Sequence, residues 1–174
     1  LDEALHTHAA AAQALLYPVS AELLATTGRP VDLFGFEPNP ARLGAAAAAS
    51  ASVPGIALTQ LGALLDAAAL GYNPTQAKPV AVLGHSQGVL AVHMVQAICE
   101  AGSIDAAAAK IDEILAIATL IGVAGTRQAR QLGLAARHGE ATPMLSVKDI
   151  TRAQVDALIE RVDGARGPIA VEIG

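Results

Sequence analysis

The spacing of apolar and polar positions predicts helices over most of the chain. Residues 1–27 are alanine-rich and amphipathic, and the pattern stops before Pro30, which predicts a helix that ends there. A second helix is expected to open near Pro54 and to end at Gly71. The alanine-rich stretch 45–52 before it is typical of a solvated helix or loop.

The pattern of apolar residues changes in the middle of the chain. An apolar run over residues 79–84 leads into a Gly-X-Ser-X-Gly motif made by Gly84, Ser86 and Gly88, and a helical run follows as far as Gly102. A run that is apolar on both faces is typical of a central parallel strand covered by helices. Strand, sharp turn and helix in this order predict a nucleophile elbow with a strained serine at its apex.

Each part of this motif suits a catalytic serine. Gly84 and Gly88 carry no side chains, so strand and helix can pass closely on either side of Ser86. The N-terminal end of the helix presents free N–H groups and a positive dipole to an oxyanion that forms there. We therefore predict that Ser86 is a catalytic nucleophile. The alternative is a glycine-rich turn in which Ser86 only caps the helix.

The rest of the chain continues an α/β pattern in which helices dominate. A long, nearly all-apolar and therefore buried helix is expected over residues 104–123. Residues 144–147 and 169–173 are expected to form strands around a helix that starts with a capping box of Thr151 and Gln154. Such a unit resembles half of a small α+β lobe and leaves a sheet edge uncovered, so the sequence looks truncated.

Composition narrows the function classes. A chain of 174 residues accommodates one core and a small lobe, and with 53% hydrophobic but only 2% aromatic residues it favours helices. The net charge of -5 disfavours a nucleic-acid partner. Cys99 is the only cysteine, so we expect no disulfide and a cytoplasmic location. No uninterrupted apolar run reaches about 18 residues, and the N-terminus lacks methionine and a basic leader, so neither a membrane span nor a signal peptide is expected.

A serine nucleophile needs a general base, normally histidine, within hydrogen-bond reach. His85 adjoins Ser86 but projects differently at the elbow, so we expect it to shape the substrate site. The remaining histidines are His6, His8, His93 and His138. The first two are expected to face solvent, the third to be partly buried, and the last to lie in a loop. Because elbow enzymes supply the base late in the chain, we expect it beyond Gly174.

The elbow also carries a family resemblance. The sequence Gly-His-Ser-Gln-Gly over residues 84–88 resembles the Gly-His-Ser-X-Gly elbow of acyl-CoA:acyl-carrier-protein acyltransferases. Its glutamine is similar to that of the acetyl transferase domain of microbial type I fatty acid synthases. Residues 53–60, 120–123 and 142–155 support the same alignment, and the likeness covers roughly residues 53–174.

The resemblance implies an α/β-hydrolase-like acyltransferase core, here over residues 1–142, with the first half of a ferredoxin-like subdomain over residues 143–174. It implies a ping-pong reaction in which Ser86 takes an acetyl group from acetyl-CoA and passes it to the phosphopantetheine thiol of an acyl carrier protein. The backbone N–H of Gln87 supplies half of the oxyanion hole. The other half, from a Gly-Gln-Gly loop, and the histidine are expected outside the chain, so the fragment alone is expected to be inactive.

The same resemblance implies partners: the carrier protein and the other domains of a large homo-oligomeric synthase, with no metal, bound cofactor, nucleic acid or membrane. Malonyl-binding relatives place an arginine just before a glycine late in the second helix after the elbow, where it grips the carboxylate. Here that position is Ile121, which favours acetyl, although Arg127 could reach back. Malonyl/palmitoyl transfer, a serine esterase or thioesterase, and a non-catalytic scaffold remain open alternatives.

Overall fold

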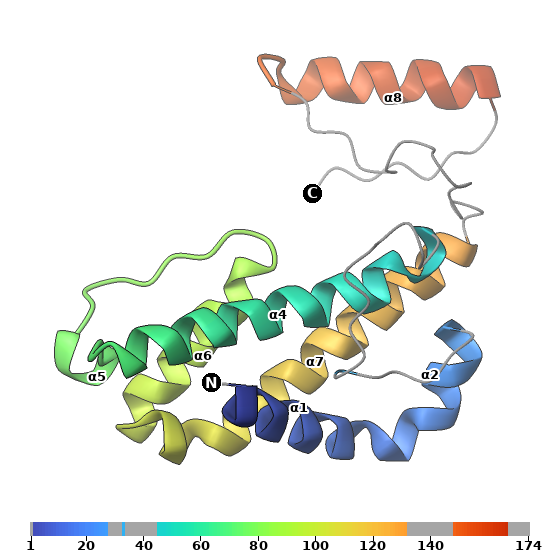
Figure 1. Ribbon diagram of the computed structural model, residues 1–174. Helices are drawn as coiled ribbons and strands as arrows, with labels where there is room; N and C mark the ends of the chain where they lie inside the picture. Colours follow the sequence, from blue (N-terminus) through green and yellow to red (C-terminus); the bar gives the residue numbers. More distant parts are fainter. Residues whose placement is uncertain (1, 28–32, 34–44, 132–147, 167–174) are drawn as a thin grey trace. The chain divides into compact units, whose positions relative to one another are not determined.

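The computed structural model describes residues 2–27, 33, 45–131 and 148–166 of the chain. The chain divides into two compact units, Leu1–His138 and Gly139–Gly174, and each is described by itself. The first unit holds the long helices and the predicted elbow (Figure 1).

The expected fold class is wrong for this structure. Neither an α/β-hydrolase-like core nor half of a ferredoxin-like subdomain is seen: the described residues form helices joined by turns and extended chain, with no strand among them. The run over residues 79–84 is extended and exposed, and no neighbouring strand pairs with it in the described part of the chain. A parallel strand forms only when its backbone is hydrogen-bonded to neighbouring strands. An apolar run cannot supply these neighbours by itself. The other two expected strands lie outside the described residues.

The N-terminal helix is divided in two. Helix α1 covers Asp2–Leu16, the 3-10 turn η1 covers Tyr17–Val19, and α2 covers Ser20–Thr27. The division falls at Pro18, whose ring lacks the N–H that would continue the helical ladder. The sequence predicts one helix over residues 1–27; the segment is helical, but it is interrupted at Tyr17–Val19.

Helix α4 is longer than predicted. It covers Ala45–Ala69 and contains Pro54, which was expected to begin it. The alanine-rich stretch 45–52, for which the sequence allows a solvated helix or a loop, therefore forms its first turns. The buried side chains of Val53, Ala57 and Leu61 recur at intervals of four residues along α4 and face the core.

Two short elements connect α4 to the elbow. The chain leaves α4 through Gly71, which has a positive φ of 94°, and enters α5, Pro74–Ala77. The Asn73 side chain caps α5 by accepting a hydrogen bond from the Thr75 N–H at 2.9 Å. The turn predicted at this point is therefore observed.

Helix α7 is the centre of the first unit. It covers Ile104–Gln131 and packs against α1, α2, α4 and α6, the last of which covers Gly88–Ala101 (Figure 1). The turn between α6 and α7 consists of Gly102, with φ 87°, and Ser103, whose Oγ accepts a hydrogen bond from the Ala106 N–H. The largest fully buried apolar side chains of this unit are Leu61, Met94, Ile98, Ile111 and Leu115.

The contact between α7 and α4 depends on a glycine. A Cβ at Gly122 would lie 2.5 Å from the backbone oxygen of Ala49, so the two helices approach as closely as their backbones allow. Thr126, one turn further along α7, accepts a hydrogen bond from the Ser50 N–H at 3.1 Å. This bond joins the start of α4 to the C-terminal half of α7.

The described part of the second unit is helix α8, Arg152–Arg166. The predicted capping box is present: the Thr151 N–H donates to Gln154 Oε1 at 2.8 Å, and the Gln154 N–H donates to Thr151 Oγ1 at 3.3 Å. Local sequence alone therefore determines where this helix begins.

By length and hydropathy alone, residues Ala49–Ala69 of α4 would suffice to cross a membrane. In this structure those residues pack on α7 and contribute Val53, Ala57 and Leu61 to the core. An apolar core helix passes the same test, so the criterion does not distinguish the two.

Candidate active site

Ser86 has the backbone conformation that an elbow requires. Its φ is 54°, in the left-handed region that residues with a side chain rarely enter. The chain reverses there, because the Gly88 N–H donates to the His85 carbonyl at 2.9 Å and the Val89 N–H donates to the Ser86 carbonyl at 3.2 Å. Helix α6 begins at Gly88, directly after this turn, and Ser86 itself is exposed.

The two glycines of the motif have different structural roles. A Cβ at Gly84 would lie 2.5 Å from the Gly88 carbonyl oxygen and 2.7 Å from Cγ2 of Val92, so the extended segment can pass α6 only with glycine there. A Cβ at Gly88 would meet nothing within 4 Å among the described residues. The close approach predicted for both glycines is thus found at Gly84 alone.

Gln87 stands at the N-cap of α6 with helical backbone angles, φ -65° and ψ -18°. Within the described part of the chain its backbone N–H has no acceptor, so this donor is free beside Ser86. Its side chain is half-buried, and Oε1 has no hydrogen-bond partner among the residues that the structure describes. A free N–H at a helix N-terminus can donate to an oxyanion.

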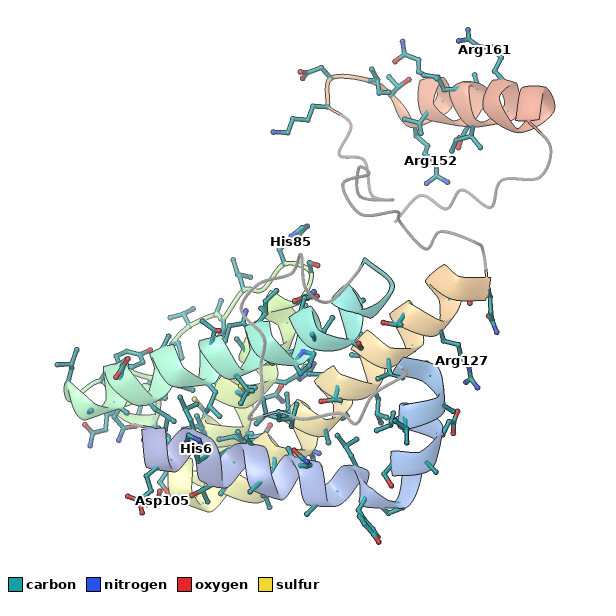
Figure 2. The ribbon with its side chains drawn as sticks, turned by 45° about the vertical axis from the view of Figure 1, so that its right-hand side comes forward. His6, His85, Asp105, Arg127, Arg152 and Arg161 are labelled. Carbon is teal, nitrogen blue, oxygen red and sulfur yellow. The ribbon has the colours of Figure 1, made fainter. Side chains whose placement is uncertain are left out.

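No histidine is joined to the nucleophile in the described residues, where the Ser86 hydroxyl makes no hydrogen bond. His85 is exposed next to Ser86, whereas His6 lies on α1, away from the elbow (Figure 2). His93 is exposed on α6, although a partly buried position was expected. His138 lies outside the described residues. The structure therefore brings the nucleophile and the Gln87 donor together and leaves the base unassigned.

The prediction for His8 is wrong. His8, expected to face solvent, is buried, and its Nδ1 lies 2.6 Å from Oδ1 of Asp112 on α7. A signal for this was present, because His8 lies three residues after Leu5 and four before Ala12, both of which belong to the core face of α1. The pair joins α1 to α7.

Ile121 lies on α7 and is half-exposed. It belongs to an exposed apolar stripe on this helix together with Ile117 and Leu120.

Arg127, the cation that was expected to be able to reach back, is engaged elsewhere. Its Nη1 lies 3.2 Å from Oε1 of Glu22 on α2. Among the described residues there is also no group of three or more His, Cys, Asp or Glu side chains that could hold a metal ion. The chemistry that these residues can offer is that of a nucleophile with an N–H donor beside it.

Comparison with known proteins gives one match. The family model described as "SAT: Starter unit:ACP transacylase in aflatoxin biosynthesis" matches residues 43–171, which include the elbow and all of α4, α6, α7 and α8. No curated protein and no solved structure matches the chain. The match confirms an acyltransferase acting on a carrier protein, and it names a starter unit of aflatoxin biosynthesis where the resemblance named a fatty acid synthase.

Proposed function

Because the chain belongs to the starter unit:ACP transacylase family, we propose that Ser86 carries the starter acyl group between coenzyme A and the carrier protein. The observation that supports this most is the left-handed backbone of Ser86, φ 54°, directly before α6. A non-glycine residue held in that region at the start of a helix is a strained position of the kind found at functional sites.

The proposed reaction has two half-steps. The Ser86 oxygen attacks the thioester carbonyl carbon, the C–S bond breaks, and coenzyme A leaves as the thiol with the proton that the hydroxyl gave up. The phosphopantetheine thiol of the carrier protein then attacks the carbonyl carbon of the serine ester, the ester C–O bond breaks, and the thiol proton returns to the Ser86 oxygen. In each tetrahedral intermediate the negative charge lies on the former carbonyl oxygen, where the Gln87 N–H and the positive end of α6 stabilise it.

Proton transfer in both steps needs a general base. We propose that this base is a histidine other than those described above, none of which is hydrogen-bonded to Ser86 in the described part of the chain. His85 is proposed to line the substrate site, since it is exposed beside Ser86. The acyl carrier protein and further domains of a synthase are proposed as partners.

We further propose that the starter acyl group is small and uncharged, acetyl being the simplest. The argument rests on Ile121, which is apolar where the resemblance places the arginine of malonyl-binding proteins, and on Arg127, whose guanidinium pairs with Glu22. These two positions offer no free cation to a malonyl carboxylate.

The test is a loading and chase experiment on the intact protein with radiolabelled acetyl-CoA. A transacylase retains the label until carrier protein with its phosphopantetheine arm is added, and the label then moves to that protein. Rapid release as acetate would indicate a hydrolase, and no labelling at all would indicate a scaffold; either result would overturn the proposal.

A further inference from the structure

The segment of residues 79–85, which leads from α5 to Ser86 at the start of α6, makes few contacts of its own (Figure 1). In the described part of the chain no backbone hydrogen bond holds residues 79–84. Val80 and Leu83 are almost fully exposed, so their side chains do not anchor the segment either. The position of the serine therefore depends on the few places where this segment touches α6.

One of these contacts joins Gly84 to Val92 of α6. A Cβ at Gly84 would lie 2.7 Å from Cγ2 of Val92. Because a carbon–carbon single bond is about 1.5 Å long, this methyl group lies no more than about 4.2 Å from the Gly84 Cα, which is contact distance. The other two atoms nearest to that Cβ belong to the Gly88 backbone, so Val92 supplies the nearest side chain.

Val92 stands on the face of α6 that is turned toward the segment. It is half-buried and lines the groove between the segment and α6 together with Val95 and Cys99, three and seven residues further along the helix. The core face of α6 is made by other residues, namely Leu90, Met94, Ala97 and Ile98. Val92 is therefore placed to hold the segment rather than to fill the core.

The branched shape of valine suits this role. Its two methyl groups on Cβ leave one strongly preferred χ1 rotamer in a helix, so Cγ2 is held at one place relative to the α6 backbone. We propose that Val92 is a positioning residue for acyl transfer, whose Cγ2 methyl sets the distance between the Gly84 backbone and α6 and thereby places Ser86. This rests on the proposed function of Ser86.

The test compares two isomeric side chains at position 92 in the intact protein. Val92→Ile keeps the branch on Cβ, whereas Val92→Leu moves it one carbon outward. We expect Val92→Leu and Val92→Ala to slow single-turnover acylation of Ser86 by acetyl-CoA about tenfold, because small displacements of a reacting group are costly, and Val92→Ile to keep the wild-type rate. Equal rates in the isoleucine and leucine variants would overturn the proposal.

The dependence on acetyl-CoA concentration separates positioning from binding. The loss in Val92→Leu should appear in the limiting rate, with the apparent Kd for acetyl-CoA unchanged, since the proposed role is to place the nucleophile. A weaker apparent Kd with an unchanged limiting rate would mean that Val92 acts on substrate binding, and the proposal would be wrong.

Val95→Ala is the matched control. Val95 is also a half-buried valine of α6 and lines the same groove, but it supplies none of the three atoms nearest to a Cβ at Gly84. This variant should acylate at the wild-type rate. A loss equal to that of Val92→Ala would show that any loosening of the groove slows the reaction, which would overturn a specific role for Val92.

The contact itself is tested by combining Gly84→Ala with Val92→Ala. Shortening Val92 removes one of the two groups that the new methyl would overlap, so the rate loss in the double variant should be smaller than the product of the two single losses. Losses that multiply would show that the two residues act independently, and the proposal would fail.

Hydrogen exchange distinguishes failure of this inference from failure of the proposed function. The Gly88 and Val89 N–H groups bond to the His85 and Ser86 carbonyls in the turn, and Val92→Ala should speed their exchange whether or not the serine is acylated. Unchanged exchange, or faster exchange with an unchanged acylation rate, would overturn the inference alone. A wild-type protein that takes up no acetyl group, with exchange as expected, would overturn the function and leave the positioning of the serine standing.

Discussion

The helices around α7 and the extended segment that precedes Ser86 are both rich in apolar residues, but the two regions differ in how far these side chains are buried. Leu61, Ile111 and Leu115 in the helices are fully buried, whereas Val80 and Leu83 in the segment are almost entirely exposed. A groove of about 490 Å³ lies between this segment and α6. The chemically specific part of the chain is therefore attached to the core mainly through the start of α6.

The difference shows which parts of the site are encoded locally. The turn at Ser86, the start of α6 and the close approach at Gly84 need only neighbouring residues, and all three are present. Packing of the apolar segment needs distant partners, and those are not among the described residues. The first prediction compares the two regions directly.

Leu61→Ala should lower the free energy of unfolding by about 2–5 kcal/mol, because it empties a fully buried site in the core. Leu83→Ala, the same change in the extended segment, should alter it by less than about 0.5 kcal/mol, since Leu83 is 92% exposed. Urea unfolding of both variants measures the two values. Similar losses in the two variants would mean that the segment is packed and that the comparison is wrong.

Gly122→Ala should cost about 1–3 kcal/mol, because the new methyl group would overlap the Ala49 backbone and push α4 from α7. The control is Gly125→Ala on the same helix, where the new Cβ would make an ordinary 3.7 Å contact with Ala49. That variant should be unchanged or slightly more stable, since alanine favours a helix over glycine. Thermal unfolding distinguishes them; a stable Gly122→Ala protein would exclude the close approach.

Gly84→Ala should slow acylation of Ser86 about 100-fold with a smaller effect on stability, because the methyl group would displace the segment that carries the serine from α6. Gly88→Ala has open space at its new Cβ and should keep most of the activity. Single-turnover acylation of the intact protein measures both. Equal losses would show that the two glycines act alike, as the sequence alone suggested.

Ile121→Arg should shift loading toward malonyl-CoA by about tenfold relative to acetyl-CoA, since a bidentate arginine–carboxylate pair is a strong charge-assisted contact. Intact mass spectrometry of wild type and variant gives the ratio of the two acyl-enzymes. Efficient malonyl loading by the wild type would refute the acetyl preference. Arg127 would then be the next residue to replace.

The sequence predicted the local features well and the long-range ones poorly. The capping box of α8, the turn at Gly102 and the left-handed turn at Ser86 follow from a few adjacent residues, and each is present. The strand over residues 79–84 was wrong, because an apolar run becomes a strand only when neighbouring strands pair with it.

The candidate site shows the same limit. Ser86 and Gln87 could be placed by counting along the elbow motif. The burial of His8 could not be predicted in the same way, because its partner, Asp112, is 104 residues away in sequence.

The measurement that tests the central claim most directly is peptide mapping of the acyl-enzyme. The intact protein is incubated with acetyl-CoA, quenched in acid and digested, and the peptide that contains the elbow is sequenced by mass spectrometry. The account predicts an acetyl ester on Ser86, absent from Ser86→Ala and removed when carrier protein is added before the quench. An acetyl group on another residue, or one that persists in Ser86→Ala, would contradict it.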